Sequence, residues 1–86
     1  MYTILLRMPV AIDEPIVVGA VFSHGGVKPV WFTWNGREIR IREITFTWKT
    51  REGSSSMLHF SVMDGRGLYE IIYNTETFKW RINCTG

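Results

Sequence analysis

The stretch that decides the fold is PVWFTWNGREIRI, residues 29–41. Asn35-Gly36 stands near its centre, and both residues tolerate the positive φ angles that a type I′ hairpin turn requires. On each side of this pair, residues that suit a buried face alternate with residues that suit the opposite face. The stretch therefore predicts two antiparallel strands joined by a tight turn.

The period of two continues along most of the chain. Residues 16–22 are apolar on both faces, which is typical of a central or fully covered strand. Later alternating stretches are separated by turn sequences at residues 64–67 and 74–77. We therefore expect an all-β fold, an antiparallel meander of about six to seven short strands that curls into a small barrel or a two-layer sandwich.

The alternation changes phase between two neighbouring stretches. Ile39 and Ile41 are odd-numbered, whereas Phe46 and Trp48 are even-numbered. A β-bulge near residues 42–43 would reset the phase, and a tight turn there, giving two short strands, is the alternative. With either, the predicted core consists of Ile16, Val18, Phe22, Phe32, Trp34, Ile41, Phe46, Trp48, Phe60, Val62, Ile72, Trp80 and Ile82.

The length of 86 residues allows one domain. We expect the β domain to span residues 14–83, with residues 1–13 an extended lead-in or first strand and residues 84–86 a C-terminal tail. Cys84 is the single cysteine, so no intrachain disulfide can form, which favours the cytoplasm. No run approaches the ~20 apolar residues of a membrane span, so no membrane is expected as a partner.

The basic residues are concentrated in the middle of the chain. The net charge is +2, and residues 28–51 carry six basic and two acidic residues. Cations that track phosphates and aromatic rings that stack on bases are how small β-barrels bind single-stranded nucleic acid. The alternation predicts that one outward face collects such groups: Arg40, Arg42, Lys49, Lys79 and Arg81, with Trp31 and Tyr73.

Catalytic chemistry has little support in the sequence. The soft metal ligands are His24, His59 and Cys84, which lack the paired spacing of a zinc site, so neither metal nor cofactor is expected. The serine loop at residues 54–56 offers a nucleophile no rigid base. Glu70 shares the parity of Ile72, so it either points inward as a functional candidate or takes a half-exposed edge position.

Several motifs resemble an uncharacterised bacterial family of short β domains. They are Pro15-Ile16-Val17-Val18, the PVWFTWNGR hairpin at residues 29–37, Ile44 with Trp48, Gly67-Leu68-Tyr69-Glu70, and the closing Trp80. The resemblance spans residues 14–82 and implies no catalytic residues. Some relatives are associated with error-prone DNA polymerase proteins, so the resemblance implies a DNA-linked role.

The leading functional expectation is a non-catalytic module that docks on an unidentified protein partner within a DNA-processing assembly, as a monomer or weak homodimer. An unpaired edge strand would suit such docking. The alternative is direct nucleic-acid binding by the basic face. A small enzyme or ligand binder is the third hypothesis, and it depends on Glu70, His59 and Cys84.

Overall fold

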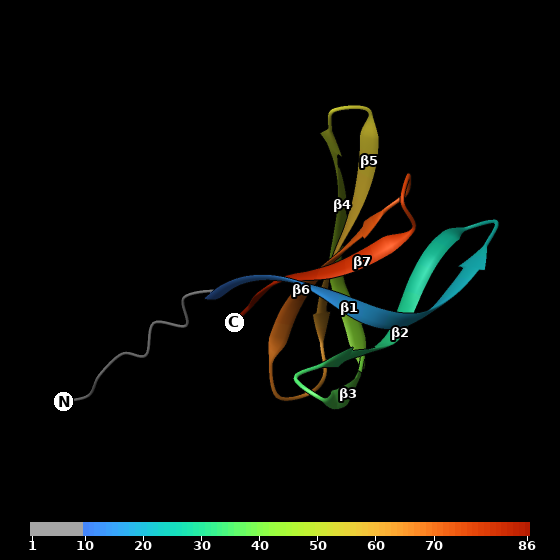
Figure 1. Cartoon of the computed structure of the whole chain (residues 1–86). Helices are drawn as coiled ribbons and strands as arrows, with labels where there is room; N and C mark the ends of the chain where they lie inside the picture. Colours follow the sequence, from blue (N-terminus) through green and yellow to red (C-terminus); the bar gives the residue numbers. More distant parts are fainter. Residues whose placement is uncertain (1–9) are drawn as a thin grey trace.

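The computed structural model describes residues 10–86, and their regular structure is entirely β (Figure 1). The strands are β1 (Val10–Ser23), β2 (Gly26–Trp34), β3 (Arg37–Arg40), β4 (Glu43–Glu52), β5 (Ser55–Met63), β6 (Leu68–Asn74) and β7 (Lys79–Thr85). All neighbouring strands are antiparallel, in the order β3-β2-β1-β7-β6-β5-β4. The prediction of an all-β antiparallel meander is confirmed.

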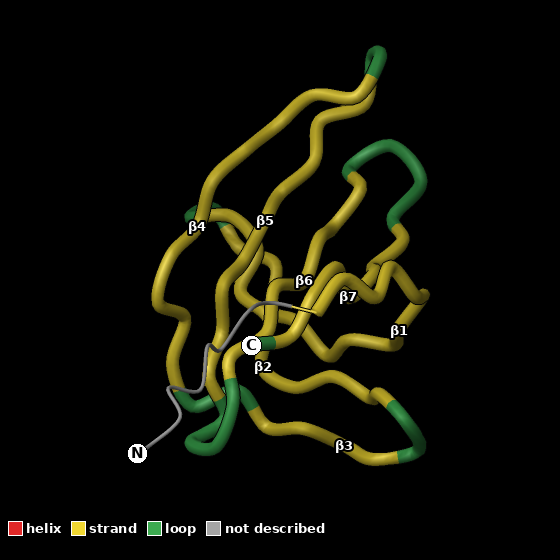
Figure 2. The backbone as a smooth tube through the Cα atoms, turned by 90° about the vertical axis from the view of Figure 1, so that its left-hand side faces the viewer, coloured by secondary structure: helices red, strands yellow, loops and turns green. Residues whose placement is uncertain are grey.

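The sheet curls into a half-barrel (Figure 2). Its two end strands, β3 and β4, are joined by only two residues, Ile41 and Arg42. The Ile41 N–H donates to Val30 O at 3.0 Å, and the Arg42 N–H donates to Met63 O at 2.8 Å. The chain therefore leaves β2 and joins β5 within one residue, which brings the two ends of the curled sheet together at this corner.

The change in alternation between residues 39–41 and residues 46–48 has two causes, a turn between two strands and a β-bulge. The chain turns between β3 and β4, as the second alternative predicted, and the β4–β5 register also shifts between Ile44 and Phe46. Phe46 and Trp48 therefore share the outer face with His59, the partner of Trp48, and Phe46 is 64% exposed. Their prediction as core residues is wrong, because the bulge lies after Ile44 rather than before it.

The buried core lies on the concave face and is rich in aromatic rings. It consists of Phe32, Ile39, Phe60, Val62, Tyr69, Ile71, Tyr73, Trp80 and Ile82. Five of these were predicted: Phe32, Phe60, Val62, Trp80 and Ile82. Ile16, Val18, Trp34 and Ile41 are half-buried against this core, and Phe22 is 59% exposed, contrary to expectation.

Strand β6 faces the other way from the prediction. Tyr69, Ile71 and Tyr73 are buried, while Glu70 and Ile72 lie half-buried on the outer face. The outer face is energetically favourable for the Glu70 carboxylate, because burying a charge without partners on the inner face would cost roughly several kcal/mol. Ile72 is therefore not a core residue.

The predicted Asn35-Gly36 turn and the predicted central strand at residues 16–22 are both present in the structure. Asn35 and Gly36 have φ angles of 53° and 72°, as a type I′ turn requires. Strand β1 is central, between β2 and β7, yet its outer face is uncovered, since Val17 is 63% and Val21 54% exposed.

The strand boundaries extend the β domain at both ends. Residues 10–13 belong to β1, and the rest of the predicted lead-in lies outside the described residues. Strand β7 runs through Thr85, so two residues of the predicted tail are part of the sheet. Among the described residues, no helix is long and apolar enough to cross a membrane.

Candidate functional site

Four arginines surround one hollow beside the edge strand β3. The hollow has a volume of about 330 Å³ and is lined by Arg37, Glu38, Ile39, Arg40, Arg42, Asp64 and Arg66. Strand β3 and the corner after it supply three of the arginines, and the β5–β6 turn supplies Arg66. The curl of the sheet brings that turn alongside β3, although the two segments are far apart in the sequence.

The guanidinium groups of the hollow form no ion pair with a carboxylate among the described residues. Within residues 10–86, the ion pairs are His59–Glu70 and Arg81–Asp13, and neither involves the hollow. The four arginine side chains are exposed and the acidic residues are two, so the hollow has a local excess of positive charge. Such an arrangement attracts anions.

The Asp64 carboxylate is occupied by the turn in which it lies. Its Oδ1 accepts the N–H groups of Arg66 and Gly67, both at 2.8 Å, and its Oδ2 accepts the Tyr69 hydroxyl at 3.2 Å. Burial alone would raise the Asp64 pKa, but these hydrogen bonds together hold the pKa below its ordinary value. The carboxylate therefore shapes the turn that carries Arg66.

Burial also raises the pKa of Tyr69, and the neighbouring Asp64 charge adds to the rise. The positive charges of Arg37 and Arg66 act in the opposite direction on the same pKa. Tyr69 packs edge-on against Phe32, with ring centroids 5.3 Å apart. Tyr69 thus links Asp64, which lines the hollow, to the aromatic core.

Arg42 lies across the backbone of the β5–β6 turn. A Cβ atom at Gly65 would be 2.9 Å from Arg42 Nη1 and 3.1 Å from its Cδ. Gly65 has a φ of 99°, a conformation that side-chain-bearing residues rarely adopt. Glycine at this position therefore allows both the turn and the close approach of the guanidinium group.

Trp31 is linked to the hollow through Arg40, which lines it. It is the direct cross-strand partner of Arg40, so the two side chains project from the same face of the sheet. The structure thus brings together Arg40, Arg42 and Trp31 of the predicted surface. Sequence reasoning missed Arg37 and Arg66 as members of this cluster, because their proximity depends on the curl of the sheet.

The other predicted surface residues lie elsewhere. Lys49 borders a separate hollow between β4–β5 and the β1–β2 turn, and Lys79 is exposed at the start of β7. Arg81 donates from Nε to Asp13 Oδ1 at 2.6 Å and from Nη2 to the Asp13 carbonyl at 2.7 Å. Tyr73 is 5% exposed in the core, so its predicted exposure on the basic face is wrong.

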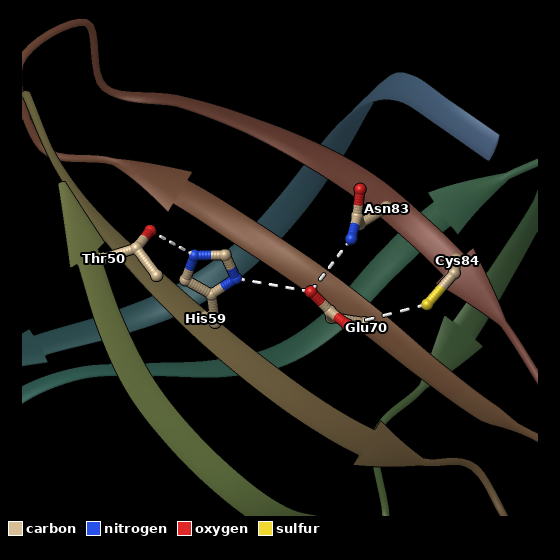
Figure 3. A network of polar contacts seen from close by, with 5 residues as sticks. All are labelled: Thr50, His59, Glu70, Asn83 and Cys84. Carbon is tan, nitrogen blue, oxygen red and sulfur yellow. Dashed lines mark hydrogen bonds and ion pairs between the residues drawn. The ribbon is translucent and has the colours of Figure 1, made fainter. Parts of the chain in front are cut away.

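A polar network crosses four strands on the outer face (Figure 3). Thr50 Oγ1 lies 2.7 Å from His59 Nε2, and His59 Nδ1 lies 3.3 Å from Glu70 Oε2. Asn83 donates to the same Glu70 oxygen at 3.0 Å, and the Cys84 thiol donates to Oε1 at 3.6 Å. Glu70 thus lies half-buried on the outer face of an interior strand, neither inward nor at an edge, and both of its carboxylate oxygens accept hydrogen bonds.

The order hydroxyl, imidazole, carboxylate is the order of a hydrolytic triad, but other features of the network favour a structural role. Trp48 covers the His59 ring, with centroids 4.9 Å apart and planes 16° apart. Glu70 Oε2 is shared between His59 on β5 and Asn83 on β7, and Oε1 accepts from the Cys84 thiol on β7. Burial, followed by the nearby Glu70 charge, raises the pKa of the Cys84 thiol, which disfavours the nucleophilic thiolate. The network therefore links β4, β5, β6 and β7 laterally.

Metal binding has no geometric support in the part of the chain that the structure describes. No group of three or more His, Cys, Asp or Glu residues there is placed to hold a metal ion. A comparison with models of known families, with curated proteins and with solved structures found no match to this chain. The resemblance noted from the sequence motifs stays a prediction.

The Asp64 turn gives a testable stability effect. We expect Asp64→Ala to lower the free energy of unfolding by about 1–2 kcal/mol at neutral pH, because three donors lose their acceptor. The folded-state pKa lies below the ordinary value of 3.8, so this stabilisation is present above that pH and is lost as the pH falls through the folded pKa. Urea unfolding at about pH 7 and about pH 3 should show a smaller difference between variant and wild type at the lower pH.

Glu76→Ala is the matched control, because Glu76 is exposed in the β6–β7 turn and its backbone, rather than its carboxylate, makes the turn hydrogen bond. It should leave stability within about 0.5 kcal/mol of wild type. A deficit for Asp64→Ala that is equally large at both pH values would contradict the role given to the ionised carboxylate.

Proposed function

We propose that the protein is a non-catalytic interaction module that binds nucleic-acid phosphates in the arginine-lined hollow. The observation that carries the proposal is that four exposed arginines, contributed by β3, the corner after it and the β5–β6 turn, line one hollow. Among the described residues these groups have no ion-pair partner, so their hydrogen-bond donors are available to a ligand.

Arginine is well suited to phosphate because its planar guanidinium donates two parallel hydrogen bonds to phosphate oxygens. The corner between β3 and β4 fixes the backbone that carries Arg40 and Arg42, and the Asp64 hydrogen bonds fix the turn that carries Arg66. Fixed backbones limit the ordering that binding would otherwise require. The hollow is therefore better prepared for phosphate than a set of isolated surface arginines.

The test is a titration of labelled DNA oligonucleotides with the purified protein at about 50 mM and about 200 mM salt. We expect binding at the lower salt that weakens steeply at the higher salt, because phosphate contacts release counterions. Arg40→Glu combined with Arg42→Glu should weaken binding at low salt by at least about tenfold, since two cations of the hollow become anions.

Lys49→Glu combined with Lys79→Glu is the matched control. It changes the net charge by the same amount, and neither lysine lines the hollow. We expect this control to retain most of the affinity. Equal losses in both double variants, or equal binding to polyglutamate and DNA, would argue for unspecific charge attraction and against the proposal.

Docking on a protein is the second candidate, and the exposed outer face of β4 favours it. Strand β4 ends the sheet beyond the corner, and Phe46 projects from it with 64% exposure. An edge strand with an exposed aromatic residue suits the addition of a partner's strand. If no oligonucleotide binds at low salt, this candidate is tested by comparing protein capture by wild type and by a Phe46→Lys variant.

A further inference from the structure

The outer face of the sheet carries an aromatic ring next to Arg40, because Trp31 is its cross-strand partner. A Cβ atom at Gly19 would overlap the Cε2, Nε1 and Cζ2 atoms of the Trp31 indole. The indole ring of Trp31 therefore lies directly over the backbone of Gly19, its partner on β1. One face of the ring is seated on the sheet, which fixes the ring without a neighbouring side chain having to hold it.

No second layer covers this part of the outer face in the described structure. Val17 and Val21, which flank Gly19 on the same side of β1, are 63% and 54% exposed. Arg40 stands beside Trp31 on β3, and Lys28 is exposed on β2 opposite Val21. The ring is thus a fixed apolar platform with Arg40 beside it on β3 and Lys28 further along β2, and Arg40 joins it to the hollow.

We infer that Trp31 stacks on an unpaired base, so that the nucleic acid bound by the hollow is single-stranded. The inference rests on the proposed function, because the strand reaches Trp31 from a phosphate held by the arginines. In a duplex the bases are stacked on one another and only their edges are accessible, so a ring lying parallel to the sheet has no base face to contact. A single strand offers both its phosphates and its base faces.

The test compares Trp31→Leu with Trp31→Phe. Leucine keeps an apolar side chain above Gly19 but has no π face, whereas phenylalanine keeps the π face. For a fluorescent deoxythymidine oligonucleotide of about 12 nucleotides, we expect Trp31→Leu to weaken binding about tenfold and Trp31→Phe to retain most of it. Binding of a duplex of equal length should be the same in all three proteins.

An abasic oligonucleotide of the same length provides the second measurement, and it needs only the wild-type protein. It carries the same phosphates but no bases, so we expect wild type to bind it about as weakly as Trp31→Leu binds the deoxythymidine strand. Because this measurement uses wild-type protein alone, it tests whether bases contribute to binding even if a Trp31 variant fails to fold.

Two results would overturn the inference. One is equal affinity of the wild type for the abasic and the base-carrying strand, and the other is an equal loss of duplex and single-strand binding in a folded Trp31→Leu protein. If the Arg40→Glu, Arg42→Glu protein still loses binding in that case, the proposed phosphate site stands and only the stacking role fails. If no oligonucleotide binds wild type at low salt, both fail.

Discussion

Trp80→Ala will lower the free energy of unfolding by about 3–5 kcal/mol, because a large aromatic side chain leaves a cavity in a small core. Trp80 is 8% exposed and lies between Phe60 and Tyr73, with ring centroids at 5.7 Å and 4.7 Å. It also pairs with Ile16 where β1 meets β7. For a domain of this size such a loss is a large part of the total stability, so the variant should melt at least about 12 °C lower.

Trp48→Ala is the matched comparison. Both substitutions remove an indole, but Trp48 lies on the outer face and contacts the His59 and Phe46 rings. We expect a cost of about 1 kcal/mol, the size of a lost ring-to-ring contact at a partly exposed site. Urea unfolding followed by circular dichroism measures both variants. A cost for Trp48→Ala equal to that for Trp80→Ala would show that the outward placement of Trp48 is wrong.

Gly19→Ala will destabilise the protein by about 1–3 kcal/mol, although alanine is usually the better strand residue. The added Cβ would overlap three atoms of the Trp31 indole, so either the ring must leave the sheet or β1 must shift. Gly25→Ala is the control, because the nearest atom to its Cβ would be 3.8 Å away. Its stability should stay close to that of wild type.

A double-mutant cycle separates the overlap from other effects of the added methyl group. In a Trp31→Ala background the obstacle is gone, and Gly19→Ala should become neutral or stabilising by about 0.5 kcal/mol. Thermal unfolding of the four proteins completes the cycle. Additive costs for the two substitutions would mean that the ring does not rest on Gly19.

The fold class followed from local patterns that survive in the folded protein. The Asn35-Gly36 turn and the alternation around it depend on neighbouring residues alone, and the structure keeps both. The face assigned to each strand was less predictable, because one added residue reverses it. The bulge after Ile44 moved Phe46 and Trp48 outward, and Tyr69 and Tyr73 occupy the inner positions of β6 that sequence parity had given to Glu70 and Ile72.

The candidate site was only partly predictable for a different reason. Arg40 and Arg42 are near each other in the chain, and alternation was enough to group them with Trp31. Arg66 reaches the same hollow because the curl of the sheet brings the β5–β6 turn to β3, which no local pattern encodes. Arg81 had the expected residue type, but its pairing with Asp13 follows from the contact between β1 and β7.

The order of the strands also has a kinetic consequence. Within residues 10–86, five of the six strand pairings join consecutive strands through short connections, and only β1–β7 joins segments that are distant in sequence. Two local meanders, β1–β3 and β4–β7, can therefore form with little loss of chain entropy. Pairing β1 with β7, here called the β1–β7 seam, instead requires the closure of a loop that contains nearly the whole domain. We expect this seam to limit the refolding rate, so that changes at Ile16 or Arg81 slow folding more than changes in the hairpin turns.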